Sequence, residues 1–397
     1  MTKIINNPKQ VKSINKKRVL DIIRREGPIS RASISRRTSL SRVTISNIVS
    51  ELIDEGLVIE AYVGDSMAGL GGKRPQLLTL NYEKLRYIGV DIYSDLFRIA
   101  VMDVKGDIKR IVKRRCKVEE NDFEKYLKTL RNQIDEILLT SEGKNVRGIG
   151  LSVPGNVKAK GGVIINSTHM KWKNVNVLDF FKDMNIPVVM DNRAVTSLIG
   201  EIWFTNHACH GESIFYMTIG EGVGGAIMIN DTIVKGMGMS AGEIGKTIIN
   251  IRNGKGTYLE NLVSDKVIVE DYLTLAKEEF PPDETIIGFA KKIIEYANNK
   301  DKIALKVVKR GAEYLGIGIV NIINLLLPKT VIITGSITYA WDIVSPVIWD
   351  TIRKYIEPPS LYELYESLQI KKSLFQEDAT LFGGVALAAS HEFENIS

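Results

Sequence analysis

The first eighty residues carry short amphipathic stripes that predict three helices. Residues 15–26 form the first, with an apolar face of Val19, Ile22 and Ile23. Residues 31–38 form the second, after Ser30, which can cap it. The third begins after Ser41 and ends at Gly56. Its apolar residues recur at helical spacing and are Ile45, Ile48, Val49, Leu52 and Ile53.

A β-hairpin is expected directly after these helices. Two β-prone segments, 57–63 and 76–80, are joined by the Gly-rich, basic loop GDSMAGLGGKRP. Three short helices and a hairpin are typical of a winged helix-turn-helix, in which the hairpin is the β-wing. We assign this module to residues 1–82.

From residue 86 the pattern changes to β-rich alternation. Strands are expected at 86–93, 96–104, 107–118 and 147–153, with a helix near 122–140. A similar series of strands recurs at 213–236. The duplication predicts an α/β body of two lobes, with a ligand-binding cleft between them.

Neither a membrane span nor a secreted scaffold is expected. The most apolar run, 315–327, is too short for the roughly 20 residues that cross a bilayer, and it contains two asparagines. The N-terminal segment lacks the apolar core of a signal peptide. The two cysteines, Cys116 and Cys209, are too few for a disulfide framework. We therefore expect a soluble, cytoplasmic protein without a membrane partner.

The charge is unevenly distributed along the chain. The formal net charge is +6, but residues 1–80 contain 14 Lys and Arg against 7 Asp and Glu. The remaining residues are close to neutral. A basic module on a neutral body favours polyanion binding at one end of the chain.

The second and third helices and the wing carry the residue types that contact DNA. Polar side chains at the start of a recognition helix reach base edges in the major groove, and basic residues of a wing follow the phosphate backbone. We expect DNA contacts from Arg31, Arg36, Ser41, Arg42, Thr44, Ser46, Asn47, Lys73 and Arg74. The alternative is a helical module that binds another protein.

Several motifs in the body resemble those of a known family. They are GLSVPGNV, GGVIIN, PVVMDNRAV, TIGEGVGGAIMINDTIVKGMGMSAGEIG, AEYLGIGIVNIINLLLPKTVIITGSI and LFGGVALA. In order and spacing they resemble the ROK family of sugar kinases and sugar-responsive repressors. The winged helix-turn-helix ahead of them resembles the repressor branch, such as the xylose repressors.

The resemblance implies a two-lobed actin-like, ribonuclease H-like ATPase fold behind the DNA-binding module. The first lobe would span 83–200, with a C-terminal helix at 379–393 returning to it, and the second would span 201–378. The resemblance also implies a homodimer or a higher oligomer. Two winged helices on one axis suit a pseudo-palindromic operator in double-stranded DNA.

The positions that match the family's kinase motifs are altered. A first phosphate loop would resemble D-x-G-G-T-K, but the chain reads DIYSD at 91–95. The motif that resembles E-N-D-A-N has Arg193 in place of the general-base Asp, and a guanidinium cannot accept a proton. Loss of a general base alone costs ~10²–10⁴-fold in rate. We expect no catalytic residue, no kinase activity and no bound ATP.

The family's zinc site is also expected to be absent. A motif resembling G-E-I-G-H ends here in Lys246, and no cysteine follows it. An ammonium group is a poor metal ligand at neutral pH. The local group His207, Cys209 and His210 is too close in sequence to favour a tetrahedral site.

The resemblance places sugar-binding positions at His169, Asn192, Arg193, Glu243, Lys246 and Glu260. Carboxylates and amides at these positions suit a neutral sugar. The added cations suit a sugar phosphate or sugar acid, or else neutralise the carboxylates and leave no ligand site. All three interpretations remain open from the sequence.

Together these features predict a sugar-responsive transcriptional repressor of carbohydrate genes. Its kinase-like body would sense the effector and form the dimer. The alternatives are an active sugar kinase with an appended DNA-binding domain, and a regulator without a small-molecule inducer.

Overall fold

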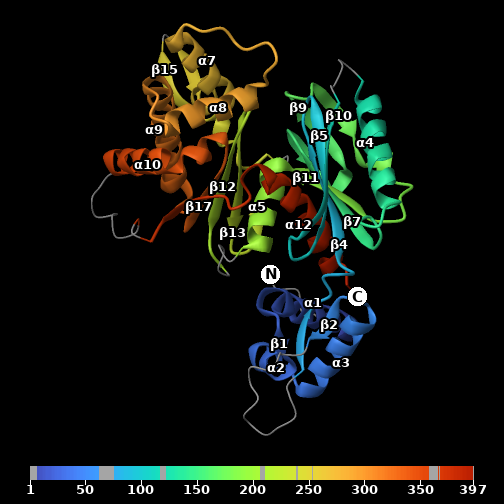
Figure 1. Ribbon diagram of the computed structural model, residues 1–397. Coiled ribbons are helices and arrows are strands. Elements are labelled where there is room, and N and C mark those ends of the chain that lie inside the picture. The colour runs from blue at the N-terminus through green and yellow to red at the C-terminus, as the bar shows by residue number, and fades with distance from the viewer. Residues whose placement is uncertain are drawn as a thin grey trace. The chain divides into compact units, whose positions relative to one another are not determined.

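The computed structural model describes residues 7–61, 76–116, 122–205, 211–237, 240–252, 254–356, 365 and 367–396 (Figure 1). The chain divides into two compact units. The first contains residues 1–151, 176–190 and 384–397, and the second contains residues 152–175 and 191–383.

The N-terminal module is the expected winged helix-turn-helix. Its helices are α1 (Pro8–Glu26), α2 (Arg31–Thr38) and α3 (Arg42–Asp54). Its small sheet has the order β1-β3-β2, from β1 (Ile29–Ser30), β2 (Val58–Ala61) and β3 (Leu77–Leu80). The antiparallel pairing of β2 with β3 confirms the wing hairpin.

Helix α1 begins at Pro8, well before the expected residue 15. Its early turns lack an apolar stripe, so periodicity could not reveal them. They are held by charge instead: Lys12 pairs with Glu51 of α3, and the buried Lys16 reaches both Glu51 and Glu55. This ion-pair group, between residues more than thirty positions apart, needed the tertiary structure to be seen.

The rest of the first unit is built on a five-stranded sheet of order β11-β7-β4-β5-β6. The strands are β4 (Arg86–Ile92), β5 (Leu96–Asp103), β6 (Ile108–Arg115), β7 (Val146–Val153) and β11 (Val188–Asn192). Helix α4 (Phe123–Leu138) packs on one face, where Tyr126 meets Phe97 edge to face. Helix α12 (Ala379–Glu394) crosses the other face, where Gly384 lies directly against Gly150.

The second unit contains a sheet of order β14-β13-β12-β17-β18 with helices on both faces. The strands are β12 (Ile214–Ile219), β13 (Val223–Ile229), β14 (Thr232–Val234), β17 (Thr330–Gly335) and β18 (Gln369–Lys372). Helix α5 (Arg193–Phe204) packs on one face through Ala194 and Leu198. The main core lies on the other face under α7 (Asp265–Ala276), α8 (Ile286–Asn298), α9 (Lys302–Leu326) and α10 (Trp341–Tyr355).

Smaller elements complete the second unit. A three-stranded sheet is formed by β8 (Asn156–Lys158), β9 (Val163–Ser167) and β10 (Trp172–Asn176). A hairpin is formed by β15 (Ile248–Arg252) and β16 (Lys255–Tyr258), and α6 (Glu260–Val263) follows it. None of the helices in the described ranges is long and apolar enough to cross a membrane.

The two units are not the lobes expected from the sequence, since the first unit also includes the N-terminal module, and the lobe boundaries stay a prediction. Residues 152–175 and 191–200 belong to the second unit. The physical reason is packing: α5 buries its apolar face on β12 and β13, and Asn192 donates a hydrogen bond to the carbonyl of Gly155. The C-terminal helix returns to the first unit from Gly384 onward.

Candidate nucleic-acid interface and ligand site

The two helices of the helix-turn-helix are set by hydroxyl caps. The side chain of Ser30 accepts a hydrogen bond from the amide of Ser33 at the start of α2, and Ser41 accepts from the amide of Thr44 at the start of α3. Between them, Ser39 adopts a left-handed conformation with φ of 59°. The two capping serines, which fix where α2 and α3 begin, could therefore be recognised from the sequence alone.

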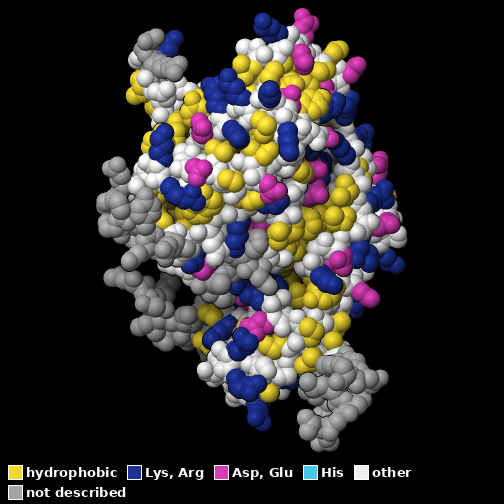
Figure 2. Space-filling model, turned by 60° about the vertical axis from the view of Figure 1, so that its left-hand side comes forward, with side chains coloured by type: hydrophobic (Ala, Val, Ile, Leu, Met, Phe, Trp, Pro, Cys, Tyr) yellow, Lys and Arg dark blue, Asp and Glu magenta, His cyan; other side chains and the backbone are white. Residues whose placement is uncertain are grey.

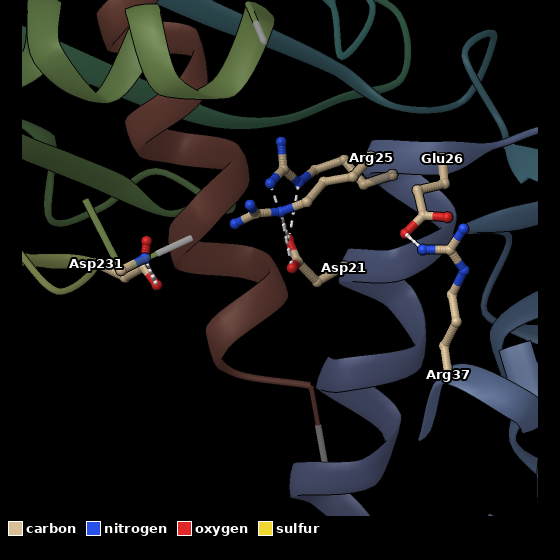
Figure 3. A network of polar contacts seen from close by, with 7 residues as sticks. Asp21, Arg25, Glu26, Arg37 and Asp231 are labelled. Carbon is tan, nitrogen blue, oxygen red and sulfur yellow. Dashed lines mark hydrogen bonds and ion pairs between the residues drawn. The ribbon is translucent and has the colours of Figure 1, made fainter. Parts of the chain in front are cut away.

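Polar contacts from α1 hold α2 in place. Arg18 donates to the carbonyls of Arg37 and Thr38 at the end of α2, at 3.3 Å each. Arg37 in turn forms an ion pair with Glu26 at the end of α1, as Figure 3 shows. These contacts join α1 to the C-terminal end of α2, where the helix carbonyls lack intrahelical partners.

Helix α3 presents a polar outer face. Ile45, Ile48, Val49 and Leu52 are buried, as the stripe predicted. Arg42, Ser46 and Asn47 are exposed on the side away from that core. Figure 2 shows several Lys and Arg side chains on the module, at the lower end of the view. The outer face can therefore reach phosphates and base edges without loss of packing.

The other residues expected at the DNA are placed differently. The hydroxyls of Ser41 and Thr44 lie 2.8 Å apart and serve the cap of α3. Arg31 forms an ion pair with Glu60 of β2, whereas Arg36 is exposed and donates to the hydroxyl of Ser33. The wing residues Lys73 and Arg74 lie outside the described residues.

Two outward residues of α3 are missing from the expected set. Val43 is 70% exposed although it is apolar, and Ser50 is also exposed. Val43, Asn47 and Ser50 follow at i, i+4 and i+7, so they lie along one line of the outer face. Val43 was missed because an apolar residue in a helix is ordinarily assigned to the core.

In the second unit, glycines bring the segment 242–246 directly against β13. Gly242 has φ of +95°, and a Cβ there would lie 2.2 Å from the carbonyl oxygen of Gly225. A Cβ on Gly245 would lie 2.1 Å from the carbonyl oxygen of Val223. Only glycine fits such approaches. This packing sets the positions of Glu243 and Lys246.

Four of the expected ligand-binding residues gather around the start of β13. A Cβ on Gly222 would lie 3.1 Å from Nε2 of His169 and 3.4 Å from Oε2 of Glu260. The ammonium of Lys246 forms an ion pair with Oε1 of Glu260. Glu243 interacts electrostatically with both Lys246 and Glu260. We call His169, Glu221, Glu243, Lys246 and Glu260 the polar cluster.

Glu221 is a member of this cluster that the sequence did not suggest as a ligand. Its Oε2 lies 3.6 Å from Nδ1 of His169. Burial raises the pKa of Glu243, an effect opposed by Lys246 and reinforced by Glu260. The cluster therefore holds three carboxyl groups, one ammonium and one imidazole, which is a set rich in hydrogen-bond acceptors.

Asn192 and Arg193 begin α5 beside the same stretch of β13. A Cβ on Gly224 would lie 3.9 Å from Cβ of Ala194 in the first turn of α5. Asn192 caps α5: its Oδ1 accepts from the amide of Ala194 at 2.8 Å, and its Nδ2 donates to the carbonyl of Gly155 at 2.6 Å. The side-chain amide is thus already used within the fold. Arg193 is the first residue of the helix.

A further ion pair lies beside this helix start. Asp191 is buried, accepts from the amide of Asn192 and pairs with Lys235. Neither Asp191 nor Lys235 was expected from the sequence, because the pairing joins residues 44 positions apart.

A protein-family model described as the ROK family matches residues 87–391 of this chain. The chain belongs to the ROK family. A second model, described as winged helix-turn-helix DNA-binding, matches residues 12–59. Both matches confirm the resemblance read from the motifs.

This ROK protein is similar over nearly its whole length to proteins named as repressors or regulators, and over about three quarters of it to a sugar kinase. The xylose repressor of Caldicellulosiruptor bescii is 29% identical over 97% of this chain and 98% of its own length. The crystal structure of a ROK family transcriptional regulator, a homologue of the Escherichia coli Mlc protein, matches with a TM-score of 0.79, 24% identity and 97% coverage of both chains. A ROK glucokinase from Streptomyces griseus matches with a TM-score of 0.63 and 22% identity, and covers 77% of this chain and 99% of its own.

The segment 91–95, where the resemblance to the family placed the first phosphate loop, ends in a tight β-turn. The amide of Tyr93 donates to the carbonyl of Leu96, which leaves Ser94 and Asp95 at the tip. The hydroxyl of Tyr126 lies 3.0 Å and 2.8 Å from the carbonyl oxygens of Tyr93 and Leu96. An acidic tip is unsuited to phosphate, because like charges repel.

Within the described part of the chain, no group of three or more His, Cys, Asp or Glu residues is arranged to hold a metal ion. Lys246 stands where the family motif would supply a histidine, and its ammonium is engaged with Glu260. His207, Cys209 and His210 lie outside the described residues.

Proposed function

We propose that this ROK protein is a sugar-responsive, DNA-binding transcriptional repressor of carbohydrate genes. The observation that carries the proposal is the exposed polar face of α3, with Arg42, Ser46 and Asn47, on a winged helix-turn-helix joined to a ROK body. The family relationship supports it, since a relative that matches over 97% of this chain is named a xylose repressor.

The effector in this proposal is a neutral sugar. Three carboxyl groups of the polar cluster face one ammonium, and that ammonium is paired with Glu260. Carboxylates accept hydrogen bonds from sugar hydroxyls, whereas a phosphate or sugar acid would add negative charge beside Glu221 and Glu243. Xylose is the first sugar to test because of the name of the relative.

The proposal excludes phosphoryl transfer. A sugar kinase needs a carboxylate to accept the hydroxyl proton of the sugar. Arg193 cannot serve, and Asp191, two residues before it, is buried and paired with Lys235. The acidic turn at Ser94 and Asp95 adds repulsion where phosphate would bind. These features support a body that binds a sugar without modifying it.

The proposal also includes a homodimer on a pseudo-palindromic operator, since two helix-turn-helix modules on a two-fold axis match two half-sites. Sugar binding would change DNA affinity only as far as the sugar prefers one conformational state over the other. A regulator of this kind acts where the chromosome lies, which we expect to be the cytoplasm.

The DNA-binding part is tested by in vitro selection of double-stranded DNA with the full-length protein. We expect a selected sequence with two inverted half-sites. Arg42→Ala should weaken binding to it and lower its salt dependence. Lys128→Ala is the matched control, since it removes the same charge from an exposed position of α4 and should leave binding unchanged. Failure to select any sequence would refute the proposal.

The effector part is tested on the selected operator. We titrate xylose, glucose, N-acetylglucosamine and xylose 5-phosphate, and measure sugar binding by calorimetry and operator affinity by fluorescence anisotropy. A neutral sugar should bind and change operator affinity, and Glu260→Gln should weaken its binding about fivefold or more, because a charged acceptor is lost. Glu270→Gln, on the exposed side of α7, is the control. If only the phosphate acts, the acidic-sugar interpretation replaces this one, and if none acts, the regulator lacks a sugar inducer.

The absence of kinase activity is tested by sugar-dependent ATP turnover with the purified protein. Turnover that depends on a sugar and on Arg193 would overturn this part of the proposal.

A further inference from the structure

An apolar side chain lies on the outer face of α3, near the N-terminal end of the helix. Val43 is the second residue of the helix and points away from the buried stripe, whose members are Ile45, Ile48, Val49 and Leu52. It is 70% exposed, more than any other large hydrophobic residue in the described part of the N-terminal module.

Among the described residues, none packs on Val43 closely enough to bury it. A side chain that is 70% exposed contributes little to the core. A β-branched residue is also less favourable than alanine in a helix. Val43 therefore costs the isolated module a small amount of helix stability without the compensation of burial.

The neighbours of Val43 argue against a protein-docking patch. Arg42, Ser46, Asn47 and Ser50 surround it on the outer face and are all exposed and polar. Protein interfaces on exposed apolar surface use contiguous patches, whereas a single apolar group within a polar face is not one. If the outer face of α3 binds DNA, Val43 is the one side chain on it that needs an apolar group of the DNA as its partner.

The major groove offers one apolar group, the C5 methyl of thymine. On this basis, which rests on the DNA-binding function proposed above, we propose that Val43 contacts the C5 methyl of a thymine in each half-site of the operator. Asn47 lies one helical turn further along the same line, and asparagine pairs with the N6 and N7 atoms of adenine. The half-site should therefore contain a thymine within one or two base pairs of an adenine that Asn47 contacts.

The test removes the methyl group alone. Each thymine of the selected operator is replaced in turn by deoxyuridine, which keeps every hydrogen-bonding group. Kd is measured for the full-length wild type, for Val43→Ala and for Val43→Thr, which keeps one methyl group. Val11→Ala is the matched control, because Val11 is an exposed valine on α1 of the same module.

We expect one deoxyuridine position per half-site to weaken wild-type binding about fourfold, which corresponds to about 0.8 kcal/mol for one buried methyl group. The same replacement should leave Val43→Ala unaffected, while Val11→Ala should respond as the wild type does. Val43→Ala and the loss of the thymine methyl group form a double-mutant cycle, and a non-additive effect of the two changes assigns the methyl contact to Val43. Circular dichroism should show that Val43→Ala keeps its helix content, since the residue is exposed.

The proposal is overturned if every deoxyuridine position is neutral, or if Val43→Ala keeps the wild-type sensitivity to methyl loss. It is also overturned if Val43→Ala changes the oligomeric state by light scattering without changing that sensitivity, because Val43 then belongs to a protein interface. These outcomes differ from a failure of DNA binding, in which the wild type selects no operator.

Discussion

The buried carboxyl of Asp265 should make the second unit less stable as pH rises. Asp265 is the first residue of α7, is 1% exposed, and accepts a hydrogen bond from the hydroxyl of Ser336. Burial raises its pKa from 3.8 to about 7, with Ser336 and Lys291 opposing the shift and Glu221 adding to it. Between about pH 4 and pH 7 the folded chain therefore keeps a proton on Asp265 that the unfolded chain has already released.

The sign and the size follow from proton linkage. Where the folded state binds more protons than the unfolded state, the free energy of unfolding falls as pH rises, by about 1.4 kcal/mol per pH unit. A pKa of about 7 against 3.8 gives a total loss on the order of 4 kcal/mol, complete above pH 7. About 2 kcal/mol of it falls between pH 5.5 and pH 8.

Asp265→Asn removes the ionisable group and keeps an oxygen that can accept from Ser336. We expect the free energy of unfolding of the variant, relative to wild type, to be about 2 kcal/mol higher at pH 8 than at pH 5.5. Other groups titrate equally in both proteins and cancel in this difference. Asp350→Asn, at an exposed position of α10, is the control and should show no such difference.

The tryptophans provide the assay. The chain has four, Trp172, Trp203, Trp341 and Trp349, and all of them belong to the second unit. Urea unfolding followed by tryptophan fluorescence therefore reports this unit by itself. If Asp265→Asn and wild type keep a constant difference in stability from pH 5.5 to pH 8, the carboxyl is not protonated in the folded state and the reasoning fails.

Three further predictions concern DNA reading and packing. Asn47→Ala should weaken operator binding by about 1–3 kcal/mol and relax the preference for adenine at one position. Fluorescence anisotropy with operators altered at each base pair measures both effects. An equal loss of affinity on all sequences would contradict base reading by Asn47. Lys16→Ala should destabilise the N-terminal module by about 2–4 kcal/mol, because the buried side-chain stem and its ion pairs with α3 are lost. Lys12→Ala, at an exposed position, should cost less than about 1 kcal/mol. Hydrogen exchange of α1 and α3 in the full chain measures both losses, and equal effects would contradict the role of burial. Gly316→Val should destabilise the second unit by about 2–3 kcal/mol in the fluorescence assay, because a Cβ at residue 316 would lie only 2.6 Å from Cβ of Thr351. Unchanged stability would show that α9 and α10 can move apart.

Local signals in the sequence predicted most of the elements. Ser30 and Ser41 were expected as caps and have that role, and α2 spans the residues predicted for it. The buried face of α3 was expected from its period, and Ile45, Ile48, Val49 and Leu52 are buried. Caps and helical periods depend on residues within about one turn of each other, so a sequence contains the whole of their physical cause.

The candidate sites were predicted in part. His169, Glu243, Lys246 and Glu260 were named as ligand positions and lie together around Gly222. The chain's similarity to the ROK family supplied these positions, since no local pattern links residues so far apart. The sequence could not show whether Lys246 pairs with Glu260. This ion pair matters because it determines which charged groups of the polar cluster remain for a ligand to contact.

The sequence by itself determined the elements, the two-part organisation and the family, because periodicity, caps and motif order are local or collinear properties of the chain. Only the tertiary structure decided how side chains are used. It showed that Asn192 donates a hydrogen bond to the carbonyl of Gly155, that Arg31 is paired with Glu60, that Lys16 is buried under α3 and that Val43 faces outward. The same residue type serves as cap, ion-pair partner, core or reading surface according to the groups that the fold brings within a few ångströms of it. Those groups lie tens of positions away in the sequence.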